Sequence, residues 1–551
     1  MINYGLQAMK NKQKNKKKPQ KPALEQAQNH RFPEILLAFV ICSAFLALAA
    51  FAINLYFSSD DLLFIERTMD RGLVQAFSSA PPDRLFFRPL TTDLYFRVLH
   101  SLFGLNPVPF HVLNFLVFAA NIWLLMAMGE KISGTRSAGL WSALLYTVSF
   151  INFRLYTWLS CIQDLVMINL VLLSLFFFTR LDQRDSRTPS NPKSKTGADP
   201  QKPPGAQGSI NFYPLFFALG PFCYFLSLFA KESAVWFPVW LWVFELLKGR
   251  SSKLNIWSLI KLRWLRHLPF DLIMLVFLPA RILLLPLPKE GKYQIAWFGA
   301  HLFHQLENYL GIIAWGSGLP IFQVPGFGFF YIILSVIILA ALGAWLVRKR
   351  IILVPVLAGL AWSALGISVF IFMANQFPYE YYISLASIGF FWAAGYLLDA
   401  VFSKVRQDWA GIVMAPLILL LLISSGSKYQ NLYKSNFVIN SARTNRIIHQ
   451  HLKQTHPDFP PGSELIFVTP YYEKDPLLIG ARALYNRKDL KIFVNDQAVS
   501  VKVIEDGLVI SKIPNFDYRN AYIFVADEGL FQEVRPNPDP GQKIIKEIKF
   551  H

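Results

Sequence analysis

Cysteine is scarce in this chain, and acidic residues are fewer than basic ones. The 551 residues include only three cysteines, Cys42, Cys161 and Cys223, all in or at the ends of apolar segments. This number and placement exclude a disulfide framework and a cysteine-based metal site. The sequence also lacks a glycine-rich nucleotide-binding loop and an internal repeat, so neither a nucleotide cofactor nor a repeat architecture is indicated.

Apolar residues are abundant instead. They make up 54% of the chain, with 49 phenylalanines and a mean hydropathy of +0.35. Repeated uncharged runs of about 18 residues or more are typical of transmembrane helices. The net charge of +19 would suggest a nucleic-acid partner for a soluble protein. Here lysine and arginine collect in loops that the positive-inside rule assigns to the cytoplasm, so we expect no nucleic acid.

Hydropathy predicts an α-helical polytopic membrane protein with about 11 transmembrane helices, which lie near residues 35–57, 109–128, 137–153, 161–179, 210–229, 234–247, 268–286, 327–347, 351–373, 383–402 and 409–425. Residues 1–34 form a basic cytoplasmic tail. The first span is expected to be retained, because it is too long for a signal-peptide core and no small-residue cleavage pattern follows.

The positive-inside rule then orients the chain. It places the N-terminus in the cytoplasm and the C-terminus outside, in a multi-pass protein of the plasma membrane, or of the inner membrane if the source is bacterial. Residues 35–425 would be the membrane domain, with outer loops at 58–108 and 287–326. The second loop contains an apolar stretch that His301, His304 and Glu307 interrupt. We expect it to be an interfacial or re-entrant element.

Residues 426–551 have the composition of a small soluble α/β domain on the non-cytoplasmic side. The segments "ELIFVTP", "LKIFVND" and "AYIFVAD" are typical of short buried strands, and helical patterns cover 435–453 and 476–485. The length suits a single small core.

Charged residues interrupt apolar sequence at several places that this topology puts on the outer face. They are Asp60 and Asp61 after the first span, Arg88 and Asp93 in the first outer loop, Asp164, the hairpin residues Lys231 and Glu232, Arg281, and Glu380. Each has an ordinary explanation: an aspartate can cap a helix, a hairpin tip can be solvated, and an arginine can snorkel to the headgroups. Ionisable groups within a membrane are nevertheless functional candidates, since each costs about 3 kcal/mol near the bilayer centre. Their convergence favours an outward-facing cavity for an anionic ligand.

Paired carboxylates and several cations at a membrane surface suit a lipid phosphate donor. Arginine and lysine neutralise the phosphate as it leaves. A carboxylate such as Asp60 accepts the proton of an acceptor hydroxyl that attacks the anomeric carbon, which gives a one-step displacement with inversion. The membrane delivers such a donor laterally, which agrees with the missing nucleotide-binding loop.

Four patches resemble one known group. They are the acidic pair Asp60-Asp61, "FRPLTTDLYFRVLHSLFGLNPVPFHVLNF", "AKESA" and "YEYYISLASIGF". Over roughly residues 54–400 the chain resembles the GT-C superfamily of polyprenyl-phosphate-sugar glycosyltransferases, and within it the protein O-mannosyltransferases and the transmembrane O-mannosyltransferases with tetratricopeptide repeats. The second patch is the specific one. The resemblance implies a hexosyltransferase with a GT-C fold, and a protein, lipid or glycan acceptor.

The chain departs from that family in three places. Only Asp164 remains of a Gly-Arg-Ala-Asp pattern, Tyr381 stands where an arginine follows the glutamate, and residues 426–551 replace the tetratricopeptide array. Another cation must therefore bind the donor phosphate if that arginine normally does.

The resemblance implies that Asp60 is the general base with Asp61 assisting, although the sequence does not choose between them. Arg88, Lys231 and Arg281 would bind phosphate. Asp164, Glu232 and Glu380 would hold these cations or bind sugar hydroxyls. No cofactor is indicated, but a divalent metal ion stays open, since His301 and His304 without a clear third ligand are weak support. The rival hypotheses are a lipid-linked-sugar flippase or another transporter, and a scaffold that presents the outer domain.

Overall fold

A computed structural model of the chain describes most of its residues. The described residues are 31–78, 86–185, 213–251, 255–285, 294–316, 353–373, 379–405, 407–468, 480–494, 499–504, 507–512, 521–527, 530–534 and 544–549. The predicted span at 327–347 and the ends of the 287–326 loop lie outside them.

Within this part of the chain, seven helices are long and apolar enough to cross a membrane. They are α3 (Arg31–Ala52), α7 (Pro107–Ser133), α10 (Ile162–Asp185), α13 (Ile256–Leu284), α16 (Val354–Ile371), α17 (Ser384–Phe402) and α18 (Gln407–Ser435). The predicted segments at 137–153, 210–229 and 234–247 are also helices, α8 (Arg136–Val148), α11 (Tyr213–Ala230) and α12 (Phe237–Ser251), but they are shorter. The chain is therefore a mostly helical membrane protein, and the count of about 11 spans stays a prediction.

Helix termini follow local sequence rules. In α7, the Asn106 side chain accepts a hydrogen bond from the Val108 amide at 3.1 Å, Pro107 occupies the first helical position, and Gly134 ends the helix with a φ of 83°. Asparagine supplies the acceptor that the first turn needs, proline has no amide hydrogen to leave unpaired, and glycine tolerates the left-handed conformation. The predicted bounds 109–128 were short because these caps extend the helix beyond its apolar run.

Small residues bring helices α16 and α17 together. A Cβ atom built on Gly359 would lie 2.3 Å from the Gly389 carbonyl oxygen, and one built on Gly389 would lie 2.1 Å from the Gly359 carbonyl oxygen. Only glycine therefore permits this approach of two backbones, as is common between membrane helices, where van der Waals packing replaces the hydrophobic drive.

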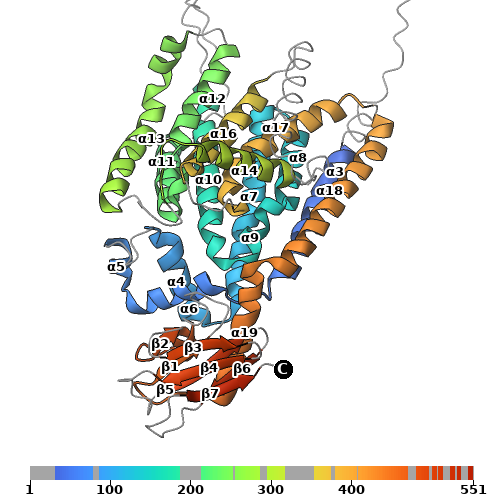
Figure 1. Cartoon of the computed structure of the whole chain (residues 1–551). Helices are drawn as coiled ribbons and strands as arrows, with labels where there is room; N and C mark the ends of the chain where they lie inside the picture. The colour runs from blue at the N-terminus through green and yellow to red at the C-terminus, as the bar shows by residue number, and fades with distance from the viewer. Residues whose placement is uncertain are drawn as a thin grey trace, which may run out of the picture.

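The first outer loop forms its own helices. They are α4 (Ser59–Asp70), α5 (Leu73–Ser78), the π-helix η1 (Pro89–Leu94) and α6 (Tyr95–Phe103), and Figure 1 shows α4, α5 and α6 between the long helices and the strands. The sequence predicts that Asp60 and Asp61 directly follow the end of the first span, and the structure differs. Helix α3 stops at Ala52, a non-helical link follows, and both acids lie in the first turn of α4. Carboxylates are favoured there because unpaired amides make the N-terminus of a helix electropositive.

The C-terminal residues contain two sheets. One has the strand order β2-β1-β5-β6, with β1 (Glu464–Val468), β2 (Lys491–Val494), β5 (Ala521–Asp527) and β6 (Leu530–Val534), and β1 is parallel to both neighbours. The other is antiparallel, with β3 (Val499–Ile504), β4 (Gly507–Lys512) and β7 (Ile544–Lys549). The three predicted strand segments are β1, β2 and β5, and the predicted helices correspond to α19 (Phe437–Thr455) and α20 (Ala481–Tyr485). The second sheet was not predicted.

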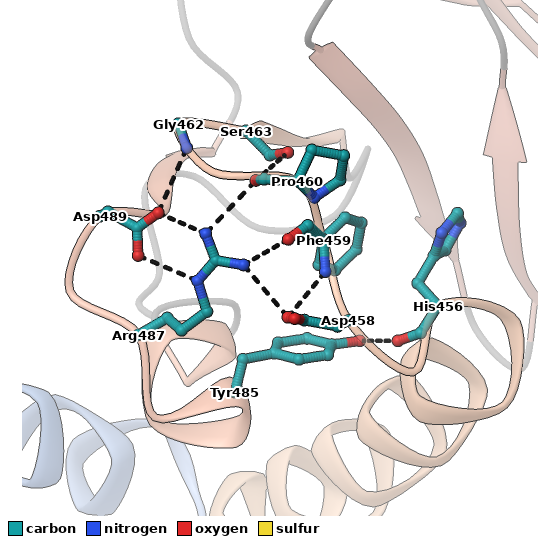
Figure 2. A network of polar contacts seen from close by, with 9 residues as sticks. All are labelled: His456, Asp458, Phe459, Pro460, Gly462, Ser463, Tyr485, Arg487 and Asp489. Atoms are coloured by element: carbon teal, nitrogen blue, oxygen red, sulfur yellow. Dashed lines mark hydrogen bonds and ion pairs between the residues drawn. The ribbon is translucent and has the colours of Figure 1, made fainter.

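Arg487 holds the segment between α19 and β1 against the segment between α20 and β2 (Figure 2). Its guanidinium donates to the Asp489 carboxylate, with Nε 2.9 Å from Oδ1, and to Asp458 Oδ1 at 3.1 Å. It also donates to the Phe459 carbonyl and, at 3.3 Å, to the Pro460 carbonyl. The planar fork of arginine suits such a set of acceptors because its five N–H groups have fixed directions.

Helix α4 also packs against the C-terminal elements. Arg482 in α20 makes a two-pronged ion pair with Asp70 at the end of α4, with N–O distances of 2.7 and 3.0 Å. One turn earlier, the buried Glu66 carboxylate accepts a hydrogen bond from the Arg482 amide at 3.1 Å. Further along, Asn445 in α19 donates to the Phe57 carbonyl at 3.0 Å, just before α4 begins. Contacts with α19 and α20 thus hold the helix that carries Asp60 and Asp61 in place.

The Glu66 contact should make stability depend on pH. Burial raises the pKa of Glu66 to about 8, although the charge of Arg482 and backbone hydrogen bonds oppose the rise. The folded protein then holds this proton where the unfolded chain has lost it, so stability should fall as pH rises from about 5 to about 9. Glu66→Gln, uncharged throughout, should flatten this fall in thermal-unfolding midpoints measured from pH 5 to 9 in detergent.

The exposed Glu130 in α7 offers a matched control. Glu130→Gln should leave the pH profile of the wild type unchanged. If Glu66→Gln also keeps the wild-type slope, the carboxyl group is ionised in the folded protein and the contact does not bury it as described.

Candidate functional site

The charged residues named from the sequence come together at neighbouring ends of several elements. Asp164 lies in the first turn of α10, Lys231 and Glu232 in the link between α11 and α12, and Arg281 in the last turn of α13. Arg88 directly precedes η1, and Glu380 begins the 3-10 helix η6 (Glu380–Ile383) that leads into α17. Residues spread over almost 300 positions thus meet in one region.

Lys231 and Asp164 form a buried ion pair at its centre. Lys231 Nζ lies 2.6 Å from Asp164 Oδ1, and each side chain is only 4% exposed. The ammonium group also lies 5.2 Å from the Tyr381 ring centroid and 5.3 Å from that of Tyr382. Cation–π attraction to these aromatic faces stabilises the lysine charge where water is excluded. Such a pair is weak evidence for stability, since removing two ions from water costs about as much as their attraction returns.

Arg88 forms the second pair, with Glu232. Its Nε and Nη2 atoms each lie 2.8 Å from one carboxylate oxygen of Glu232, its Nη1 donates to Gln163 Oε1 at 2.5 Å, and its guanidinium covers the Phe86 ring. Burial would raise the pKa of Glu232, but the charge and hydrogen bonds of Arg88, with a further contribution from Arg281, lower it to about 2. Glu232 is therefore a fixed anion that orients Arg88.

The two pairs belong to one network. Glu232 follows Lys231 in the chain, Gln163 precedes Asp164, and Asp164 lies within electrostatic range of both Arg88 and Glu232. Arg281 acts on the same pair from α13. Three cations thus gather where the sequence predicts a phosphate-binding cavity. The structure brings these residues together, while their roles in binding stay a prediction.

Glu380 has a partner that the sequence reasoning missed. Arg154, in the short helix α9 (Phe153–Thr157), places its Nε atom 3.0 Å from Glu380 Oε1, and the two side chains are 8% and 11% exposed. The sequence did contain a signal, because Arg154 is the only charged residue between Arg136 and Asp164. It lies directly after the predicted span at 137–153, and the sequence alone assigns it no role. A cation therefore stands close to Tyr381, where the resembled family carries an arginine.

Asp61 is fully engaged in holding α4. One carboxylate oxygen accepts from the Ser58 amide and hydroxyl, both at 2.8 Å, and the other accepts from the Ser160 amide at 2.7 Å and from its hydroxyl. Burial raises the pKa of Asp61 to about 6, against the lowering effect of these hydrogen bonds. Ser160 lies in η3 (Leu159–Cys161), directly before α10, so this carboxylate joins α4 to the network.

Asp60 has a different environment in the same turn. It is half-buried, whereas Asp61 is 1% exposed. With all four acceptor positions of Asp61 in use, that residue suits a positioning role. Which of the two acids receives a proton stays a prediction.

The histidines of the second outer loop do not join this region. His301 begins α14 (His301–Gly316), and its Nε2 lies 2.9 Å from the Ala296 carbonyl oxygen, while His304 is exposed. Among the residues that the structure describes, no three histidine, cysteine or acidic side chains cluster as metal ligands would. The interfacial position of this loop stays a prediction.

No protein-family model matches the sequence, and no curated protein sequence is significantly similar to it. Solved structures do resemble it. ArnT from Cupriavidus metallidurans, solved with bound undecaprenyl phosphate, is 13% identical, with 83% of this chain and 85% of that one covered and a TM-score of 0.42.

Two structures of an oligosaccharyltransferase from Archaeoglobus fulgidus are also similar. The one tethered to an acceptor peptide is 10% identical, with 84% of this chain and 64% of the enzyme covered and a TM-score of 0.45. The other, AglB with an inhibitory peptide and dolichol-phosphate, is 10% identical, with 83% and 64% covered and a TM-score of 0.39. This chain spans less than two thirds of the archaeal enzyme. With every TM-score below 0.5, these similarities alone assign no function.

The Lys231–Asp164 pair allows a test of how the site is held. Lys231→Met should lower the free energy of unfolding by about 3 kcal/mol, because it leaves the Asp164 carboxylate buried without its cation. The double variant Lys231→Met/Asp164→Leu should recover much of this loss, because both charges are gone. Chemical or thermal unfolding of the two purified proteins measures the difference.

An equal loss in the single and double variants would show that the two side chains are not coupled.

Proposed function

We propose that this protein is a GT-C-type inverting glycosyltransferase, which moves a hexose from a polyprenyl-phosphate carrier to an acceptor hydroxyl on the non-cytoplasmic face of the membrane. The observation that supports this most is the convergence of the Lys231–Asp164 and Arg88–Glu232 pairs, with Arg281, on the segment that binds Asp61. Buried ion pairs are weak evidence for stability, and buried charges at this density are typical of a site for a charged ligand.

The cations would bind the donor phosphate. Arg88, Lys231 and Arg281 come from three separate parts of the chain, so together they can surround a phosphate from different directions. Glu232 and Asp164 would keep two of them oriented before the donor arrives. Groups arranged in advance stabilise the negative charge that grows on the departing phosphate without reorganising. Arginine adds a planar fork that fits two phosphate oxygens.

Asp60 would act as the general base. As the acceptor hydroxyl oxygen bonds to the anomeric carbon, the bond from that carbon to the phosphate oxygen breaks, and the hydroxyl proton passes to the Asp60 carboxylate. The polyprenyl phosphate leaves with the electron pair. Asp61 would fix the first turn of α4 so that Asp60 faces the reacting centre, which requires a geometry held to within about 0.5 Å.

Residues 426–551 would contribute to acceptor binding on the non-cytoplasmic side. The acceptor can be a protein, a lipid or a glycan. Helices α19 and α20 contact α4, so an acceptor bound by the C-terminal elements would lie next to the proposed base. The resembled family has a tetratricopeptide array in place of residues 426–551, so the role of this domain is proposed from its position alone.

Asp60→Asn and Asp61→Asn should have different consequences. Asp60→Asn should reduce sugar transfer by about 100-fold or more, the usual contribution of a general base, with normal stability. Asp61→Asn should lower the free energy of unfolding by about 2 kcal/mol, because the amide cannot accept all four hydrogen bonds. The measurement is transfer of labelled sugar from polyprenyl-phosphate hexose into the lipid, glycan and protein fractions of membranes, together with unfolding of the purified variants.

Label that appears in one fraction only with the wild type would identify the acceptor class. Full transfer by a folded Asp60→Asn variant would sink the assignment of the base. Movement of the labelled lipid across proteoliposomes without covalent transfer would instead support the flippase hypothesis.

A further inference from the structure

A group of aromatic side chains surrounds the Arg154–Glu380 pair. The Arg154 guanidinium lies 4.6 Å from the Tyr379 ring centroid, 5.6 Å from that of Tyr381 and 4.9 Å from that of Phe437. Trp158 packs edge-on against Tyr381 and Phe437, with centroids 5.5 and 5.6 Å apart. Arg154 and Trp158 therefore share the same two rings, and Phe437, at the start of α19, is 49% exposed.

Two N–H groups here are buried without a partner among the residues that the structure describes. Arg154 Nη1 and Trp158 Nε1 make no hydrogen bond, whereas Arg154 Nε and Glu380 Oε1 lie within ion-pair distance of each other. The Arg154 side chain is 8% exposed and Trp158 is 6% exposed. Unpaired buried donors and acceptors are costly and rare in folded proteins, so their gathering around two rings requires a physical reason.

The chemistry of these atoms defines what would pair with them. The two N–H donors need a ligand group that accepts, and the Glu380 carboxylate beside them, which Arg154 already pairs, can accept from a ligand group that donates. The hydroxyls of a sugar do both. The flanking aromatic faces match the C–H face of a sugar ring, since rings supply apolar contact area with few internal rotations to freeze. A phosphate would find no use for the Glu380 carboxylate, which accepts but cannot donate. An isoprenoid chain would leave both N–H groups unpaired.

We propose that Arg154, Trp158 and Glu380, with the rings of Tyr381 and Phe437, form a pyranose-binding subsite. This rests on the proposed glycosyltransferase function and extends it, because the cations of the network would bind phosphate while this group binds a sugar. The two adjoin, since Lys231 also contacts the Tyr381 ring. The pyranose can be that of the lipid-linked donor or that of a glycan acceptor, and the chemistry of recognition is the same.

The test uses the full-length protein in detergent with the Asp60→Asn substitution, so that no turnover occurs during titration. The probes are a synthetic polyprenyl phosphate, the same lipid carrying a hexose, and the methyl glycosides of glucose, mannose and galactose. Lipid affinities come from calorimetry, and the methyl glycosides are followed by saturation-transfer NMR. Each is measured with the parent protein, with Trp158→Phe and with Arg154→Lys.

Trp158→Phe is the decisive variant, because it keeps an aromatic ring and removes the unpaired N–H. The smaller ring leaves a gap at a buried position, so some loss of stability is expected whether or not Trp158 binds a sugar, and sugar affinity is the readout that separates the two roles. Sugar binding should weaken about tenfold, which is what one hydrogen bond of ordinary net strength contributes. Trp123→Phe, on an outer face of α7 where that side chain is 53% exposed, is the matched control and should change neither.

The two sugar sources give different results. If the subsite holds the donor sugar, the parent protein binds the glycosylated lipid more tightly than the bare lipid, and Trp158→Phe and Arg154→Lys reduce this advantage while bare-lipid affinity is kept. If it holds an acceptor sugar, the lipid ratio stays constant and methyl-glycoside binding falls. Unchanged sugar binding in both variants, or no binding of any sugar probe by the parent protein, would overturn the subsite. Failure of the glycosyltransferase proposal itself would appear separately, as no transfer of labelled sugar by the wild-type protein into any membrane fraction.

Discussion

A charge that leaves water for an apolar interior must be matched by an opposite charge, and this requirement shapes the region between the helix ends. Burying the Lys231 ammonium group in the link after α11 would cost much free energy without Asp164 at 2.6 Å. Arg88 and Glu232 neutralise each other in the same way. Each pair joins elements that are far apart in the chain. The pairing of charges therefore also fixes where α10, α11 and η1 stand relative to one another.

The same region explains why two adjacent acids in α4 differ. Asp61 is satisfied entirely by Ser58 and Ser160, which fastens the first turn of α4 to the segment before α10. The far end of the helix is fastened as well, because Arg71 pairs with Asp93 of η1 at 3.3 Å and Asp70 pairs with Arg482 of α20. A helix held at both ends gives Asp60 a defined position, which a base in a displacement reaction needs.

The aromatic group around Arg154 differs from the ion-pair network in what it leaves unsatisfied. In the network, carboxylates and cations are matched at close distance, so an arriving phosphate would share cations that are already oriented. Around Arg154, two N–H donors remain without a hydrogen bond within the described residues, and aromatic faces surround the Arg154–Glu380 pair. This contrast places two kinds of ligand chemistry side by side: an anion that neutralises cations, and a hydroxyl-rich ring that completes hydrogen bonds. A sugar joined to a phosphate would present both.

The sequence by itself determined the helical character, most helix positions and the candidate charges, because uncharged runs and isolated ionisable residues depend only on the solvent that each segment prefers. It also determined β1, β2 and β5, which are short apolar runs. Only the tertiary structure decided that α4 starts after a non-helical link, that Arg154 reaches Glu380, and that Asp61 accepts hydrogen bonds from Ser160. These outcomes depend on contacts between residues about 100 or more positions apart, and no local pattern of polarity records which partner a buried charge will meet.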